Sequence, residues 1–98
     1  MKPALSIRPI ARTEIQETFH WYEQRRRGLG ERFLQALRET LSAIEANPQQ
    51  YARIRGEIRR AAIQRFPYAI LYLAEPEATV VLACFHSKRD PRRWYSRR

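Results

Sequence analysis

The chain has 98 residues, 44% of them hydrophobic and three of them glycine, which is enough for one hydrophobic core and excludes a low-complexity disordered protein. We therefore expect a single domain over residues 1–98. The net charge is +9, with 8 basic against 6 acidic residues in the first 50 and 11 against 4 in the remainder, which predicts that the C-terminal half attracts phosphates or an acidic protein.

The N-terminal residues predict a short strand followed by a helix. Leu5 and Ile7 alternate with polar neighbours, which indicates an edge strand that ends at Pro9, because proline cannot continue a strand ladder. The segment Thr13-Glu14-Ile15-Gln16 has the form of a capping box and predicts the start of a helix. That helix is expected to run as far as Arg25-Arg26-Arg27.

A second helix follows a glycine-containing break. Gly28-Leu29-Gly30 interrupts the first helix, and apolar residues then recur every three or four positions until Asn47-Pro48. Because the connection is so short, the two helices should run antiparallel as a hairpin.

The remainder of the chain has patterns typical of β-strands. The runs 57–64, 68–74 and 79–85 are separated by turns that contain proline. The last run is continuously apolar, which predicts a central strand covered on both faces. The expected fold is therefore α+β, in the order β-α-α-β-β-β, with an N-terminal helical hairpin packed on a mainly antiparallel sheet.

The sequence indicates neither a cofactor nor a metal. Gly28 and Gly30 lack the spacing of a phosphate-binding loop, and His20, His86 and one cysteine do not make a zinc ligand set. Cys84 lies in an apolar run, so we expect a buried and unreactive thiol. A lone cysteine, with no recognisable signal peptide or membrane span, favours the cytoplasm.

His86 is the strongest candidate for proton transfer. It closes the last predicted strand beside Lys88 and Arg89, whose charges favour the neutral imidazole. A neutral histidine among arginines can act as a general base on a ribose hydroxyl, as a metal-free ribonuclease requires. The interpretation that we favour is structural: His86 bonds the backbone where the strand meets the tail, and Arg89 pairs with Asp90.

The arginines of the strand at 57–64 are predicted to point to two faces. Arg59 and Arg65 share parity, whereas Arg60 points the other way. An arginine on the face covered by the helices needs a partner, for which the glutamates of the hairpin are candidates. In the polar tail, Trp94 and Tyr95 should fold back onto the sheet, with stacking on a nucleobase as the less favoured alternative.

Several motifs occur together and in order. They are Arg59-Arg60, then Phe66-Pro67-Tyr68, then His86-Ser87-Lys88-Arg89-Asp90-Pro91 with Trp94 behind it. With the predicted element order, these motifs resemble the RelE/ParE superfamily of small bacterial toxins over nearly the whole chain. The resemblance implies that the chain is the toxin of a type II toxin-antitoxin module. It implies that a cognate antitoxin wraps and neutralises this toxin, and that the toxin contacts operator DNA only through the complex with the antitoxin.

The superfamily divides by target, and the fold does not distinguish the branches. RelE-like members cut messenger RNA on the ribosome, whereas ParE-like members poison DNA gyrase, a property associated with plasmid stabilisation. This chain has no terminal His-Tyr pair, and its lysines are only Lys2 and Lys88, so it lacks the lysine-rich surface of the RelE branch. The resemblance therefore favours a ParE-like gyrase inhibitor without chemistry of its own.

Each alternative implies its own residues. A surface that binds the target or the antitoxin would include Arg59, Arg60, Arg89, Arg92, Arg93 and Trp94. A ribosome-dependent endoribonuclease would instead use Arg59, Arg65, His86, Arg89 and Tyr95. A third alternative is a degenerate toxin kept for antitoxin binding, which the absence of a growth defect on expression would indicate.

Overall fold

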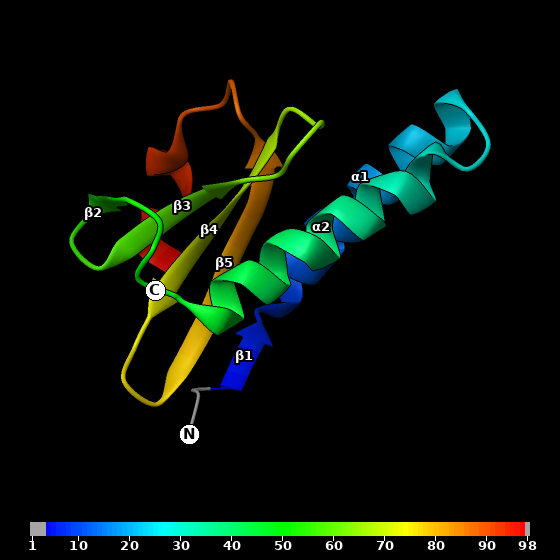
Figure 1. The fold of residues 1–98 in the computed structure, drawn as a ribbon. Coiled ribbons are helices and arrows are strands. Elements are labelled where there is room, and N and C mark those ends of the chain that lie inside the picture. The colour runs from blue at the N-terminus through cyan, green and yellow to red at the C-terminus, as the bar shows by residue number, and fades with distance from the viewer. Residues whose placement is uncertain (1–3, 98) are drawn as a thin grey trace.

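The computed structural model describes residues 4–97, in which a sheet of five strands lies against a helical hairpin (Figure 1). The elements in chain order are β1 (Ala4–Ile7), α1 (Pro9–Arg25), α2 (Leu29–Ala46), β2 (Arg53–Arg55), β3 (Ile58–Ala62), β4 (Tyr68–Ala74), β5 (Ala78–His86) and the 3-10 helix η1 (Pro91–Arg97). The strand order is β1-β5-β4-β3-β2, with β1 parallel to β5 and the other neighbours antiparallel. The expected α+β fold is confirmed, with β2 and η1 as additional elements.

The first helix begins earlier than the capping box predicts. Helix α1 starts at Pro9, because proline at the first helical position has no N–H to satisfy and a φ already suited to the helix. Thr13 lies inside the helix, where its hydroxyl donates to the carbonyl of Pro9 at 3.2 Å. The prediction of a capping box at Thr13 was therefore wrong.

Glu23 fixes the turn between the two helices. Its carboxylate oxygens accept hydrogen bonds from the backbone N–H groups of Gly28 and Gly30, each at 3.0 Å, and such N–H groups have no partner within a helix at its start. Gly28 has a φ of +89°, and a Cβ on Gly30 would lie 2.8 Å from the ring and the carbonyl of Phe19. Both glycines are therefore required for the hairpin.

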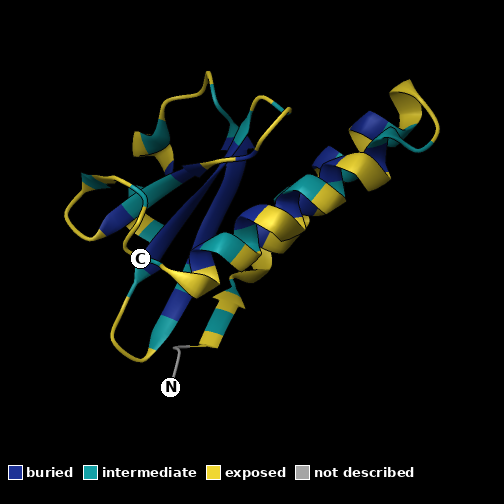
Figure 2. Ribbon diagram, viewed as in Figure 1, coloured by how far each residue is buried: buried dark blue, intermediate teal, exposed yellow. Residues whose placement is uncertain are grey.

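The sheet separates two apolar clusters, and most residues of β4 and β5 are buried (Figure 2). The cluster on the hairpin side includes Phe33, Ile44, Ile70, Tyr72 and Val81. The cluster on the opposite side includes Ile58, Leu71, Leu82, Phe85 and Trp94. The prediction that the last strand is covered on both faces is confirmed, although β4 rather than β5 is the middle strand.

The C-terminal tail covers the second cluster, as expected, but as a helix that the sequence did not predict. Trp94 of η1 is buried and packs on Phe85, with the ring centroids 4.5 Å apart. Tyr95 packs at the edge of the same cluster. Within residues 4–97, no helix combines the length and the apolar character needed to cross a bilayer.

Candidate functional site

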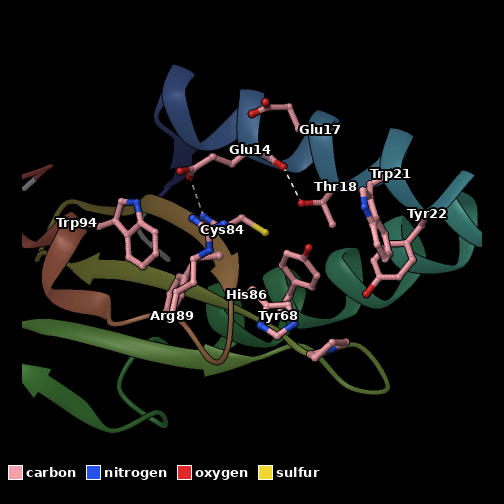
Figure 3. Close-up of a pocket in the computed structure, with 12 residues that line it drawn as sticks. Glu14, Glu17, Thr18, Trp21, Tyr22, Tyr68, Cys84, His86, Arg89 and Trp94 are labelled. Atoms are coloured by element: carbon pink, nitrogen blue, oxygen red, sulfur yellow. Dashed lines mark hydrogen bonds between the residues drawn. The ribbon is translucent and has the colours of Figure 1, made fainter. Parts of the chain in front are cut away.

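A pocket of about 600 Å³ lies between α1 and the adjoining ends of β4 and β5 (Figure 3). Its α1 wall carries Glu17, and Trp21 beside it is 48% exposed. The opposite wall carries His86 and Arg89. The pocket therefore has an acidic wall, a basic wall and an aromatic lining, which is suited to a segment with both polar and apolar groups.

A clasp between Glu14 and Arg97 closes the edge of β5 beside this pocket. Strand β1 ends at Ile7, opposite Val81, so the edge of β5 beyond that point has no neighbouring strand. There Glu14 accepts a hydrogen bond from the backbone N–H of Cys84 at 3.1 Å, and Arg97 donates to the carbonyl of Leu82 at 3.1 Å. The two side chains also form an ion pair at 3.0 Å. They thus replace the missing strand, because backbone groups at a strand edge need hydrogen-bond partners.

His86 has the structural contact that the sequence favoured. Its Nδ1 accepts a hydrogen bond from the backbone N–H of Lys88 at 3.1 Å, and its ring lies edge-on to that of Tyr68. In the neutral imidazole this contact places the proton on Nε2, which is then a donor. His86 as placed here therefore lacks a nitrogen available to act as a general base.

The expected pairing of Arg89 with Asp90 was wrong. Asp90 instead forms an ion pair with Arg92 at 2.6 Å and accepts a hydrogen bond from the backbone N–H of Arg92 at 3.0 Å. This is the local turn that aspartate makes with the residue two positions on. The side-chain hydrogen bond from Arg92 lowers the pKa of Asp90. Arg89 points to the pocket instead (Figure 3).

Arg59 and Arg60 point to opposite faces, as predicted, and both hold loops. Arg59 donates to the carbonyls of Gln49 and Tyr51, at 3.2 and 2.7 Å. The expected carboxylate partner was wrong, because the loop after α2 brings backbone carbonyls over the strand. Arg60 donates to the carbonyl of Ser87 at 3.2 Å and lies over the ring of Phe85.

Arg65 was expected to point to the same face of a strand as Arg59, but β3 ends at Ala62 and Arg65 lies outside it. It lies in the turn before β4 with a φ of +71°, the one positive φ among the non-glycine residues of the described range. This conformation costs an L-residue roughly 1–2 kcal/mol. Arg65 lines a second pocket of about 440 Å³, between the turn and α2.

The exposed candidates gather on the segment after β5. Arg89, Arg92 and Arg93 are all exposed there, whereas Trp94 is packed beneath them. We call these three residues the C-terminal arginine surface. Sequence reasoning missed both residues of the clasp, since Glu14 was assigned to the capping box and no local signal pointed to Arg97.

The ribonuclease candidates do not converge on one site. His86 and Arg89 share the first pocket, but Arg65 lines the second one. Arg59 holds the loop after α2. Tyr95 packs with the second cluster, and the guanidinium of Arg55 lies over its ring. A general base and several phosphate ligands are therefore not assembled around one reacting atom.

Cys84 has the inert environment that the sequence predicted. Burial, with a smaller contribution from the charge of Glu14, raises the pKa of this thiol to about 12, so that it stays protonated near neutral pH. Across residues 4–97, no three His, Cys, Asp or Glu side chains lie close enough to hold a metal ion.

The comparisons with known proteins agree with this geometry. A structure described as "Chromosomal ParDE TA system from P. aeruginosa" superposes with a TM-score of 0.78, at 12% sequence identity, over 89% of this chain and 98% of that one. At this identity the likeness shows the fold alone. No curated protein matches the chain. A family model described as the ParE toxin of the type II toxin-antitoxin system parDE matches residues 5–91. The chain therefore belongs to the family of ParE toxins of type II toxin-antitoxin systems.

Proposed function

We propose that this ParE toxin poisons DNA gyrase by binding it through the C-terminal arginine surface, and that its cognate antitoxin neutralises it. The observation that carries the proposal is the dispersal of the ribonuclease candidates, which leaves binding rather than bond cleavage as the use of the exposed arginines. Arg89, Arg92 and Arg93 extend from a segment anchored by Trp94. Both partners act in the cytoplasm, where we place the protein.

The electrostatics of the surface favour an acidic protein partner. The side chain of Arg92 is 77% exposed even in its ion pair with Asp90, and such exposed pairs exchange readily for a partner's carboxylates. Arginine makes bidentate contacts with carboxylates. Arg93 lies over the Trp94 ring, 5.5 Å from its centroid. The surface therefore has both charge and a defined position.

The direct test is gyrase incubated with ATP, supercoiled plasmid and the purified toxin. Protein-linked, double-strand-broken DNA should accumulate. Arg89→Glu and Arg93→Glu should reduce the broken product at least tenfold, because reversal of one charge adds repulsion at a complementary interface. The matched control is Arg27→Glu, an exposed arginine in the turn between the helices. Full poisoning by both surface variants would refute the surface assignment.

A ribosome-dependent endoribonuclease remains the second candidate, because His86 and Arg89 do share a pocket with aromatic residues that can stack on a base. For this function, His86→Gln should abolish cleavage of messenger RNA on the ribosome while ribosome binding persists. Intact gyrase with the toxin present, together with cleaved messenger, would favour it. A chain that gives neither product and no growth defect would be a degenerate toxin kept for antitoxin binding.

A further inference from the structure

The second pocket, which we call the α2 groove, lies between α2 and the turn that joins β3 to β4. Its volume is about 440 Å³. Leu29, Ala36 and Phe66 give it apolar lining, and Arg32 and Arg65 contribute cations from the helix and from the turn. The remaining lining residues are Gln35, Gln64 and Glu39, and the carboxylate of Glu39 accepts a hydrogen bond from Gln35 at 3.2 Å, so the groove holds two cations against one carboxylate. The proposed function uses none of these residues.

The two arginines of the groove are available to an external anion. The ion pairs that the structure shows among residues 4–97 involve Arg53, Arg92 and Arg97, and neither Arg32 nor Arg65 has a carboxylate partner within this range. Cations beside a partly buried apolar surface match a ligand that presents a carboxylate next to an apolar side chain.

The conformation of Arg65 is a second, independent observation. Its φ of +71° suits asparagine or glycine, yet an arginine occupies the position. The turn is held by its own backbone, because the N–H of Ile63 donates to the carbonyl of Tyr68 at 2.9 Å. Strained residues held in this way cluster at ligand-binding positions.

The apolar lining of the groove is rigid. The ring of Phe66 lies 5.0 Å from that of Tyr22 and 5.5 Å from that of Phe33, in edge-to-face contacts. Phe33 is itself fully buried. A ligand would therefore meet a preformed surface, which lowers the entropic cost of binding.

We propose that the α2 groove binds an acidic, partly apolar segment of the cognate antitoxin, with a carboxylate on Arg32 and Arg65 and an apolar side chain on Phe66. This inference rests on the proposed neutralisation by an antitoxin. The groove lies on the hairpin side of the sheet, whereas η1 covers the other side (Figure 1). An antitoxin segment held here does not need to displace the target from the C-terminal arginine surface.

The test measures antitoxin affinity and toxicity separately. Arg32→Glu and Arg65→Glu should each weaken binding of the purified cognate antitoxin at least tenfold by calorimetry, while both variants still poison gyrase as the wild type does. In cells, both should escape an antitoxin dose that rescues the wild type. The control is Arg12→Glu, an exposed position of α1 outside the groove lining, which should bind and be neutralised normally.

Arg65→Asn separates binding from folding. Asparagine tolerates the left-handed conformation, so this variant should keep or raise the melting temperature and still lose at least fivefold in antitoxin affinity. A merely structural arginine would give the opposite result, with lower melting temperature and unchanged affinity.

The outcomes are distinguishable from failure of the proposed function. Wild-type affinity in both charge-reversal variants, with a folded protein, would overturn the groove proposal alone. Loss of gyrase poisoning with normal antitoxin binding would assign the groove to the target, and loss of self-association in sedimentation would assign it to a second copy. If the wild type bound no antitoxin, the groove proposal and the proposed neutralisation would both fall, whereas the gyrase assay would still test the proposed target.

Discussion

The two faces of the sheet are covered by elements of very different size. On the hairpin side, two long helices bury a cluster in which Phe33 contacts the rings of Tyr22, Phe66 and Tyr68. On the other side, the seven-residue η1 covers the sheet mainly through Trp94. The comparison indicates that the hairpin face supplies most of the stability, whereas the C-terminal face positions its exposed arginines with few contacts.

The largest expected effect comes from truncating one buried aromatic side chain on each face of the sheet and comparing the losses in stability. Phe33→Ala should lower the free energy of unfolding by about 4 kcal/mol, within the range for buried phenylalanines. Trp94→Ala should cost only about 2 kcal/mol, because Phe85 is the one aromatic ring within residues 4–97 stacked on it, and the flexible side chains of Arg93 and Arg97 that lie over it can move into the vacated space. Urea denaturation measures both values. Equal losses would contradict the unequal contribution of the faces.

The next largest effect is a loss of stability at alkaline pH, caused by Cys84 in the cluster on the hairpin side. Burial raises the pKa of Cys84 from 9.0 to about 12. The stabilisation is complete below the unfolded pKa near 9 and is lost as pH rises through the folded value, since the unfolded chain then releases a proton that the native state keeps. At about pH 10.5 the loss should be roughly 2 kcal/mol.

The control for this pH effect is Cys84→Ala, compared with the wild type at each pH. The variant is expected to start less stable, because a buried group has been removed, but to lose less between pH 9 and 12. Parallel curves for the two proteins would assign the alkaline loss to other groups, of which Tyr72 is the first to consider because burial also raises its pKa to about 12.

The smallest expected effect concerns the clasp. Glu14→Gln keeps an acceptor for the N–H of Cys84 but removes the charge that holds Arg97, at a cost of about 1 kcal/mol. Hydrogen exchange in η1 should accelerate more than in α2. Glu17→Gln, an exposed position on the same helix, is the control. Uniform acceleration across the chain would show that the clasp supports the whole fold rather than the C-terminal face.

Periodicity was sufficient to predict the elements that form the core. The apolar spacing of α2 and the runs of β4 and β5 are properties of one segment each, and these elements appear within a few residues of their predicted bounds. Strand β2 was missed because Arg53-Ile54-Arg55 offers a single apolar residue. The start of α1 was misplaced because a proline and a polar cluster competed as signals.

The site was less predictable because its contacts join distant segments. Arg60 bonds a carbonyl 27 positions away, and the clasp joins Glu14 to a residue 83 positions away. No local pattern indicates which arginine will meet a loop carbonyl and which will stay exposed. The motifs identified the family correctly, but the assignment of individual arginines required the three-dimensional arrangement.

The pairing of β1 with β5 has a consequence for synthesis of the toxin. Residues 4–7 find their partners only when residues 78–81 have been made, so the sheet cannot close while the chain is still short. Contacts between such distant segments also form slowly. A chain whose translation stops before β5 would lack both that interior strand and the C-terminal arginine surface. Incomplete translation would therefore yield a fragment that cannot complete the sheet.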